Sequence, residues 1–505
     1  MFHPRQSVPD RRRKRGCVLT HIPAGQRRRH SLPAGIVALA IGVRGLGLPA
    51  AGLCEEANSA ANAAAASAET PSTDAAPFSG NAELKARLDA PGKLVIAGER
   101  LHADLLRRFY IAHGYQTVWD GHPEEANRLR DAISHAAEHA LDPGLFHRAT
   151  LAGRSAALLP VERDLLLSDA FLSYADAMSR GAMPIEERAD DEDLVPEPVD
   201  VVAVLDAAMA DPDPAKVIET LAPASSEYRT MQRAYAEYRA IAAAEQSARG
   251  KRRSTEKAAN AERRARQIAI NLERLRWLPR HMPPDRVIVN AAIARLQLFR
   301  NDQPVFTTRV VVGEPDKQTP EFQSTIDSVL FNPPWNIPRS IAQKEILPKL
   351  AADPGYLISH HMRFRGNGGI QQEAGPYSAL GRLKFEMNDR YDVYLHDTPD
   401  KSLFLAVARM MSHGCVRVEN PRALVVLLLG EPAQVIDKGI ASGHTARRLL
   451  PAAIPIFVLY QTAYVEPDGS IRFRADPYER DDEIWRYLAR VQQLPVAQDS
   501  AAGQR

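Results

Sequence analysis

The chain has 505 residues, enough for two or three domains at about 100–200 residues each. Charged residues make up 25% and hydrophobic residues 45%, which excludes a largely disordered chain. The net charge of +2 hides an asymmetry: residues 1–53 hold ten basic side chains against one acid, a balance of +9, so the remainder carries −7. This single basic block excludes a broadly basic nucleic-acid-binding protein.

The N-terminal block has the order of a secretory signal. Arginine clusters precede an apolar, small-residue stretch over residues 32–53, and an Ala/Ser-rich run without apolar periodicity follows. Arg44 interrupts the apolar stretch, so we expect no stable membrane-spanning helix and membrane contact only through an uncleaved leader. We predict an export segment over residues 1–55 and a disordered Ala-rich tether over residues 56–92. The alternative is a disordered basic tail of a cytosolic protein.

A helical pattern follows the tether. Apolar residues such as Leu101 and Leu105 recur at helix spacing, which predicts a helical domain over residues 93–227. The composition then turns to Ala, Glu, Arg and Lys, a pattern typical of a solvated helix face. We therefore predict a charged helical linker over residues 228–283, with Gly250 separating two helices.

After the linker the pattern changes to short β-type runs. Two runs flank the turn Asn301-Asp302, which predicts a hairpin. Asn420-Pro421 predicts a helix start, with a side-chain cap and proline at the first helical position. The expected strands are residues 287–290, 296–299, 306–312, 325–330, 391–396, 454–460, 462–465 and 471–473.

These runs predict a mostly β domain over residues 284–465. A helical pattern over residues 341–350 interrupts the strands, which indicates an inserted helical subdomain at about residues 340–370. We predict a C-terminal extension with a disordered tail over residues 466–505. The fold class expected from these patterns is α+β, with an N-terminal helical domain ahead of the β domain.

One cysteine stands apart from the other two. Cleavage of the leader would remove Cys17 and Cys54 and leave Cys415 alone, as either an inert buried thiol or a reactive one. His413 lies two residues before it, and His396 ends a predicted strand 19 residues before it. A nearby imidazole can favour the thiolate, so the pattern points to a cysteine nucleophile with histidine as acid and base.

The neighbours of this cysteine suggest how it would act. Gly414 allows a tight turn whose backbone N–H groups could face a developing oxyanion. Asp397, or a carbonyl beside it, could orient a histidine base. The alternatives are an inert core cysteine, a structurally satisfied histidine, and a zinc site formed by His396, His413 and Cys415. No metal-binding spacing supports the last of these, so we expect neither metal nor cofactor.

His396 followed by Ser412-His413-Gly414-Cys415-Val416-Arg417 resembles the signature of the L,D-transpeptidase catalytic domain, the YkuD family. The similarity extends over about residues 94–480 to the large type typified by YcbB, including its helical scaffold domain. The segments that carry this wider similarity are residues 109–119, 271–279, 332–338, 371–381, 394–399 and 460–465.

The resemblance implies an exported, periplasmic enzyme that acts on peptidoglycan stem peptides. Cys415 would attack the third-position diamino acid of a donor tetrapeptide and release the terminal D-alanine. The acyl group would then pass to an amine on a neighbouring stem, forming a 3→3 cross-link. It also implies that carbapenems add to this cysteine, that cell-wall synthesis proteins are further partners, and that nucleic acid is not a partner.

The resemblance also assigns roles to individual residues. His396 would be the general base, oriented by the backbone at Asp397, with His413 in support. Arg417 would organise the loop or hold a substrate carboxylate, a solvated surface arginine being the alternative. Trp335 and Tyr377 are expected, with Asp397, to contact substrate, although either aromatic ring could equally belong to the core.

One feature departs from the large type. Those enzymes usually carry a small peptidoglycan-binding domain between scaffold and catalytic domains, and here only the charged linker occupies that place. Substrate would then be supplied through a partner or the scaffold domain, and the insertion would cap the cleft. Two other functions stay open: carboxypeptidase or D-amino-acid exchange on the same stems, and a non-catalytic wall-binding scaffold.

Overall fold

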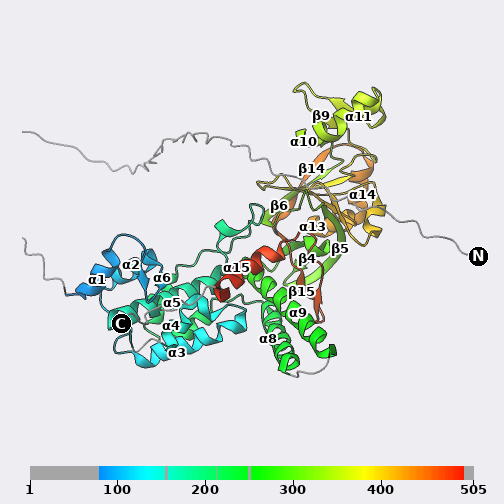
Figure 1. Cartoon of the computed structure of the whole chain (residues 1–505). Coiled ribbons are helices and arrows are strands. Elements are labelled where there is room, and N and C mark those ends of the chain that lie inside the picture. Colours follow the sequence, from blue (N-terminus) through cyan, green and yellow to red (C-terminus); the bar gives the residue numbers. More distant parts are fainter. Residues whose placement is uncertain (1–78, 154–156, 212, 248–251, 494–505) are drawn as a thin grey trace, which may run out of the picture. The chain divides into compact units, whose positions relative to one another are not determined.

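The computed structural model describes residues 79–153, 157–211, 213–247 and 252–493 (Figure 1). The predicted export segment lies outside the described residues, as do most of the predicted tether, Cys17, Cys54 and Gly250. Within the described ranges, no helix combines the length and apolarity needed to cross a membrane.

The last part of the predicted tether is helical, which corrects the expectation of disorder up to residue 92. Helix α1 (Ala82–Asp89) buries Leu84 and Leu88, which lie four residues apart on one face. The Asn81 side chain caps the helix by accepting the N–H of Leu84 at 3.0 Å. Leu84 and Leu88 are only two apolar residues at helix spacing, and they follow an Ala-rich run without apolar periodicity. For this reason the sequence pattern did not predict the helix.

The helical domain surrounds one long helix, α5 (Pro160–Arg180). Most of its residues are buried on all sides, because the shorter helices pack around it. Its other elements are β1 (Val95–Ile96), β2 (Glu99–Arg100), α2 (Ala103–Ala112), α3 (Pro123–His135), η1 (Ala136–His139), η2 (Pro143–Phe146), α4 (Arg148–Gly153), η4 (Ile185–Glu187), α6 (Val201–Ala208) and α7 (Pro214–Glu219).

A buried ion pair lies at the centre of this domain. The Asp169 carboxylate on α5 accepts a hydrogen bond from His147 Nε2 at 2.8 Å and another from the His102 N–H at 2.7 Å. Burial disfavours the charged His147 ring, but the carboxylates of Asp169 and Glu99 outweigh it and raise its pKa to about 9. His147 is therefore charged in the folded protein at neutral pH.

We expect the helical domain to lose stability as the pH rises from about 6.5 to 9. A histidine whose folded pKa is raised contributes fully below its unfolded pKa, and this contribution is lost as the pH passes the folded value, here about 9. The loss is on the order of 3 kcal/mol. Thermal unfolding of the full chain at pH 6 and pH 9 measures it. The control is His147→Asn, because asparagine tolerates the positive φ of 58° at this position. This variant should be less stable at pH 6, and its stability should depend less on pH. An unchanged pH dependence would contradict the account.

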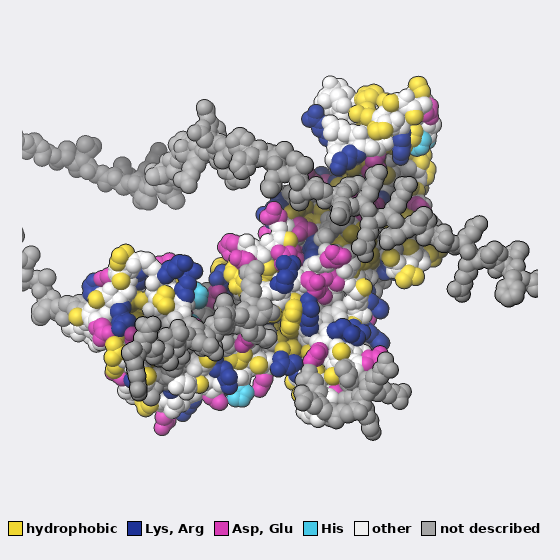
Figure 2. Space-filling model, in the orientation of Figure 1, with side chains coloured by type: hydrophobic (Ala, Val, Ile, Leu, Met, Phe, Trp, Pro, Cys, Tyr) yellow, Lys and Arg dark blue, Asp and Glu magenta, His cyan; other side chains and the backbone are white. Residues whose placement is uncertain are grey.

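Two long helices form a hairpin after the helical domain. Helices α8 (Ser226–Ser247) and α9 (Arg252–Arg276) pack along each other, and basic and acidic side chains are intermingled on the face that Figure 2 shows. The end of α9 is not a solvated face, however. Asn271 is buried and donates to Thr462 Oγ1 at 2.9 Å, and Arg274 pairs with Asp481 at 2.5 Å. This part of the predicted linker is therefore built into the β domain.

The β domain is a closed ring of strands. Its order is β5-β13-β11-β10-β6-β14-β3-β4, and β4 pairs back with β5 while β12 adds beside β5. The strands are β3 (Arg286–Asn290), β4 (Arg295–Arg300), β5 (Gln303–Gly313), β6 (Phe322–Phe331), β10 (Leu383–Met387), β11 (Leu395–His396), β12 (Met410–Ser412), β13 (Val416–Val418) and β14 (Ala446–Leu459); η5 (Ala291–Ile293) and η7 (Lys401–Leu405) are short turns.

The predicted hairpin is confirmed, and the predicted helix cap is wrong. Asn301 and Asp302 both have positive φ, 50° and 62°, as a tight turn between β4 and β5 requires. Helix α13 (Pro421–Leu429) does begin at the proline, but the Asn420 side chain donates to Thr308 Oγ1 at 3.2 Å and does not cap it. Helix α14 (Ala433–Ala441) follows.

The predicted α+β fold class is confirmed, and the insertion holds a small sheet beside its helices. It holds α10 (Arg339–Ile341), η6 (Ala342–Ile346), α11 (Leu347–Ala352) and α12 (Tyr356–Ser359), together with a sheet of β7 (Trp335–Asn336), β9 (Ile370–Gln372) and β8 (Met362–Phe364). A small core of its own, which includes Ile337, Ile346 and Leu357, holds these parts together.

The segment after residue 465 is not a separate extension. Strands β15 (Ala463–Val465) and β16 (Ile471–Phe473) form a hairpin across the predicted boundary, and α15 (Asp481–Gln493) packs against α9. The buried Arg480 guanidinium bonds Glu321, the residue before β6, at 3.1 Å and also pairs with Asp191 of the helical domain. The sequence showed the hairpin but not these long-range pairs.

Candidate active site

Strand register brings the candidate residues to one face of the β domain. His396 on β11 lies opposite Arg417 on the parallel β13 and opposite Lys384 on the antiparallel β10. Side chains alternate along a strand, so Tyr394 and Cys415, two residues before His396 and Arg417, face the same way. All five of these side chains line one cavity of about 820 Å³.

The ring of His396 is held in one tautomer. Its Nδ1 lies 2.5 Å from the Asp397 carbonyl oxygen, which can only accept, so Nδ1 carries the proton. Burial lowers the pKa of His396 to about 3, helped by the positive charges of Arg417 and Lys384 and opposed by the bond to Asp397. The ring is therefore neutral at pH 7, and its Nε2 has a free lone pair with which to accept a proton.

The loop that carries Cys415 is tied down on both sides. Thr319 Oγ1 donates to the Gly414 carbonyl at 2.8 Å, and Ser412 Oγ donates to the Cys415 carbonyl at 2.5 Å. Gly414 has a φ of 109°, a conformation that side-chain-bearing residues rarely adopt, which explains glycine at this position. The nucleophile candidate thus sits on a rigid turn at the start of β13.

The Gly414 N–H, which was predicted to bind an oxyanion, already makes a hydrogen bond within the loop. The Gly414 N–H donates to Ser412 Oγ at 3.2 Å. Of the two N–H groups considered from the sequence, that of Cys415 is therefore the better placed to bind an oxyanion, because an N–H already bonded within the loop must first release its acceptor.

The Cys415 thiol lies near the Tyr394 hydroxyl and the Asp392 carbonyl oxygen. The Tyr394 hydroxyl interacts with the Cys415 sulfur and with Trp335 on β7, and Cys415 Sγ lies 4.0 Å from the Asp392 carbonyl oxygen. Burial raises the pKa of the Cys415 thiol, and the hydrogen bonds from Tyr394 and the charge of Lys384 offset this only in part. The free protein therefore holds a neutral thiol beside a neutral imidazole.

Two of the cations that line the cavity, Lys384 and Arg417, differ in their partners. Lys384 pairs with Glu386 at 2.8 Å and lies 4.3 Å from the Tyr394 ring centre. The Arg417 guanidinium makes no hydrogen bond or ion pair with another described side chain, and burial lowers its pKa. An arginine held without a partner inside a cavity is suited to receive a carboxylate.

The insertion contributes one wall of the cavity. His413 Nε2 and Glu345 Oε1 on η6 lie 2.5 Å apart, which joins the insertion to the loop of the cysteine. Trp335, Ile341 and Lys344 also line the cavity from this side. His413 therefore meets the insertion, while His396 lies under the cavity on the sheet.

Two segments of the chain match the models of known domains. Residues 284–432 match the L,D-transpeptidase catalytic domain, YkuD, and residues 104–234 match the Scaffold domain. The chain therefore contains a YkuD domain and a Scaffold domain. A Haemophilus influenzae protein named "Putative L,D-transpeptidase" is 33% identical over 240 residues, which cover 43% of this chain and 48% of that protein. The chain thus spans about half the length of this curated relative.

Solved structures of L,D-transpeptidases resemble this chain only weakly. One from Mycobacterium smegmatis is 13% identical with a TM-score of 0.20, covering 35% of this chain and 58% of that one. A mutant enzyme from Enterococcus faecium is 9% identical with a TM-score of 0.16, covering 35% of this chain and 50% of that one.

Two predicted substrate contacts lie elsewhere in this YkuD domain. The Asp397 carboxylate accepts the Arg382 N–H at 2.8 Å and pairs with Lys401 at 2.6 Å, so only its carbonyl serves the site. The Tyr377 ring stacks on His361 at 3.5 Å and does not line the cavity. Stacking within the insertion accounts for its position, and both expectations are corrected.

Sequence reasoning missed three residues that the structure adds. Tyr394 lies two residues before His396, and the period of a strand could have placed it on the same face. Lys384 and Glu345 carried no comparable signal. The first depends on the pairing of β10 with β11, and the second on how the insertion folds back. Among the described residues, no group of three or more His, Cys, Asp or Glu side chains could hold a metal ion.

We expect the alkylation rate of Cys415 to keep rising above pH 9. Burial raises its thiol pKa above the usual value for cysteine, and a neutral His396 supplies no positive charge to hold a thiolate at lower pH. The rate of iodoacetamide addition should climb about tenfold per pH unit through neutrality, because the thiolate is the nucleophile. Mass spectrometry of the peptide containing Cys415 measures this rate separately from the other cysteines. A plateau at or below pH 7 would instead reveal a preformed thiolate–imidazolium pair.

Proposed function

We propose that the protein is a peptidoglycan L,D-transpeptidase that acts through an acyl-enzyme on Cys415. The observation that carries the proposal is the shared face of Cys415 and His396, the latter with a free Nε2 lone pair. Neighbouring strands lie about 4.8 Å apart and two residues span about 6.6 Å along a strand, so the two side chains can meet across the strands.

In the first step the Cys415 sulfur attacks the carbonyl carbon of the third-position diamino acid of a donor tetrapeptide. The thiol proton passes to Nε2 of His396, which is neutral in the free protein. The bond to the terminal D-alanine then breaks, and His396 returns the proton to the departing amine. The Cys415 N–H can stabilise the oxyanion that develops in between.

In the second step an acceptor amine attacks the thioester. A side-chain amine of a neighbouring stem forms the new amide bond, which is a 3→3 cross-link, as the carbon–sulfur bond breaks. The amine proton passes through His396 to the departing thiolate, which restores the Cys415 thiol. Because the resting thiol is neutral, its proton must leave as the carbon–sulfur bond forms, and the position of His396 decides the rate.

The cavity offers places for the rest of the stem. We assign the unpartnered Arg417 to a stem carboxylate and Trp335 to the donor groove, while His413 supports the site through Glu345 on the insertion. We also propose that the protein is exported to the periplasm, that carbapenems acylate Cys415, and that proteins of cell-wall synthesis are further partners. It would serve cell-wall biogenesis and cell shape.

Product analysis with a defined donor tests this function. The purified protein is incubated with disaccharide tetrapeptide, and mass spectrometry follows the products. Cross-linked tetrapeptide–tripeptide or tripeptide–tripeptide dimers with a 3→3 bond and free D-alanine support transpeptidation. Tripeptide alone would assign a carboxypeptidase, and incorporation only of an added D-amino acid would assign exchange. No change in the donor would leave a non-catalytic wall protein.

A further inference from the structure

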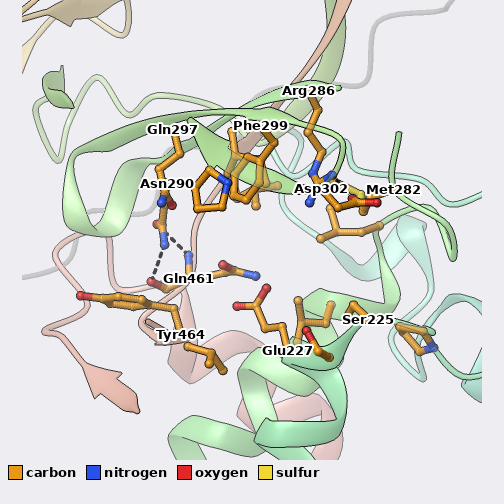
Figure 3. Close-up of a pocket in the computed structure, with 18 of the residues that line it drawn as sticks. Ser225, Glu227, Met282, Arg286, Asn290, Gln297, Phe299, Asp302, Gln461 and Tyr464 are labelled. Atoms are coloured by element: carbon orange, nitrogen blue, oxygen red, sulfur yellow. Dashed lines mark hydrogen bonds and ion pairs between the residues drawn. The ribbon is translucent and has the colours of Figure 1, made fainter. Parts of the chain in front are cut away.

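A second cavity, of about 810 Å³, lies on another side of the β domain. It is lined by the start of α8, the segment after α9, the outer faces of β3 and β4, and the region around β15, and it shares no lining residue with the cavity at Cys415. Figure 3 shows its labelled side chains around an open centre.

The floor of this cavity is a row of flat side chains on two paired strands. Arg286 on β3 lies opposite Phe299 on β4, with its guanidinium 4.4 Å from the ring centre. Two positions along β4, Gln297 faces the same way, and Arg295 then lies 4.8 Å from the Tyr464 ring centre. The floor thus consists of two aromatic rings, the two guanidinium groups that pack against them, and the Gln297 amide between the two pairs.

Two carboxamides point at the cavity without a partner. Gln461 is 6% exposed, yet its side-chain amide makes no hydrogen bond with any described residue and points into the centre of the cavity in Figure 3. The Gln297 amide is likewise unbonded within the described chain. Glu227 of α8 points to the same space from the opposite wall. Both amides are open to the cavity, where a ligand can take the place of the water that solvates them.

The charges around the cavity cancel. Arg286 pairs with Asp302 at 2.6 Å and Arg295 pairs with Glu466 at 3.0 Å, while Arg280 and Glu227 are the other charged lining residues. A site for phosphate or a free carboxylate would carry a net positive charge. Here three arginines balance three carboxylates, and the two amides add uncharged donors and acceptors, which suits a hydroxyl-rich ligand without net charge.

The cavity also continues into a neighbour. A cavity of about 620 Å³ shares its lining residues Arg295, Tyr464 and Glu466. A ligand longer than a few sugar rings can therefore run past the Arg295–Glu466 pair from one cavity to the next. Both cavities are lined by Arg295 of β4, and neither is lined by Cys415 or His396.

We propose that the cavity over β3 and β4 binds the glycan strand of peptidoglycan, by hydrogen bonds from Gln461 and Gln297 to hydroxyl and acetamido groups and by stacking of a sugar face on the partly exposed ring of Phe299. This proposal rests on the proposed function for the identity of the polymer. The site holds a strand other than the one at Cys415, so it anchors the enzyme without taking part in the chemistry.

Binding of glycan without stems tests this proposal apart from the chemistry. The probes are peptide-free glycan chains, made by amidase treatment of peptidoglycan, and the proteins are the full chain, Gln297→Ala, and Gln297→Ala with Gln461→Ala. We expect about a fivefold loss of affinity for each carboxamide removed. Turnover of a soluble tetrapeptide donor should be unchanged, while turnover on intact peptidoglycan falls.

The control is Gln323→Ala, which removes an exposed carboxamide on β6 outside the cavity and should change nothing. Gln297→Ala serves alone if the double variant unfolds. Unchanged glycan affinity in both variants would overturn the proposal, and so would wild-type binding only to stem-bearing material, which would mark a peptide site. Absence of turnover with every donor would instead refute the proposed function, while the glycan affinities would still decide this site.

Discussion

Replacing Cys415 by alanine is expected to abolish release of D-alanine and formation of cross-links. No other group lining the cavity can form the thioester, so the loss should reach at least about 10⁴-fold in turnover. The side chain lies at the cavity wall and contributes little to the core, so the variant should fold normally. Release of D-alanine from a tetrapeptide donor, measured by mass spectrometry, gives the rate.

Two further variants distinguish the histidine that transfers protons from the histidine that only supports the site. His396→Gln keeps a polar side chain but loses the ring that accepts the thiol proton, so it should approach the loss seen for Cys415→Ala. His413→Gln removes the contact to Glu345 and should lower turnover less, because His413 does not face the thiol from the sheet. Residual turnover above about one part in a hundred in Cys415→Ala would contradict the assignment of the nucleophile.

Replacing Arg480 by alanine is expected to destabilise the protein by about 3–5 kcal/mol. Arg480 is 5% exposed and its guanidinium bonds Glu321 at 3.1 Å, Gln318 at 2.8 Å, and Asp191. Its removal leaves the Glu321 carboxylate, itself 1% exposed, with one cation fewer in a buried site. Urea unfolding followed by intrinsic fluorescence measures the change.

The pH dependence of this variant identifies the cause. Burial raises the pKa of Glu192 to about 7 and also raises that of Glu321, so both carboxyls gain protons more readily in the folded than in the unfolded protein. The cost of Arg480→Ala should therefore be smaller at pH 5 than at pH 8. The matched control is Arg486→Ala on the exposed side of α15, expected within about 0.5 kcal/mol of the wild type. Equal costs at both pH values would point to lost packing alone.

Local patterns predicted the parts of the fold that depend on neighbours in the sequence. The hairpin at Asn301-Asp302 follows from residues that tolerate positive φ between alternating apolar runs. The motif around Cys415 identified the loop, since glycine is required by its backbone conformation. The predicted strand over residues 391–396 shortened to its last two residues, because Asp389 accepts the N–H groups of Tyr391 and Val393 and holds a turn.

Long-range pairing set the rest, and single positions carried no signal for it. Lys384 reaches His396 only because β10 pairs with β11 in one register. Arg274 and Arg480 are buried because they pair with acidic residues from distant segments. The predicted linker and the predicted C-terminal extension, which hold these arginines, are therefore packed into the β domain. Tyr377 was expected in the groove from its motif, but stacking on His361 holds it in the insertion.

The central claim is that Cys415 carries the acyl group, and the mass of the trapped intermediate tests it most directly. The protein is mixed with a tetrapeptide donor without an acceptor, quenched in acid within seconds, and analysed intact and after proteolysis. The account predicts a mass increase equal to the donor less D-alanine, located on Cys415 and absent from Cys415→Ala. No added mass, or the same adduct on another residue, would contradict it.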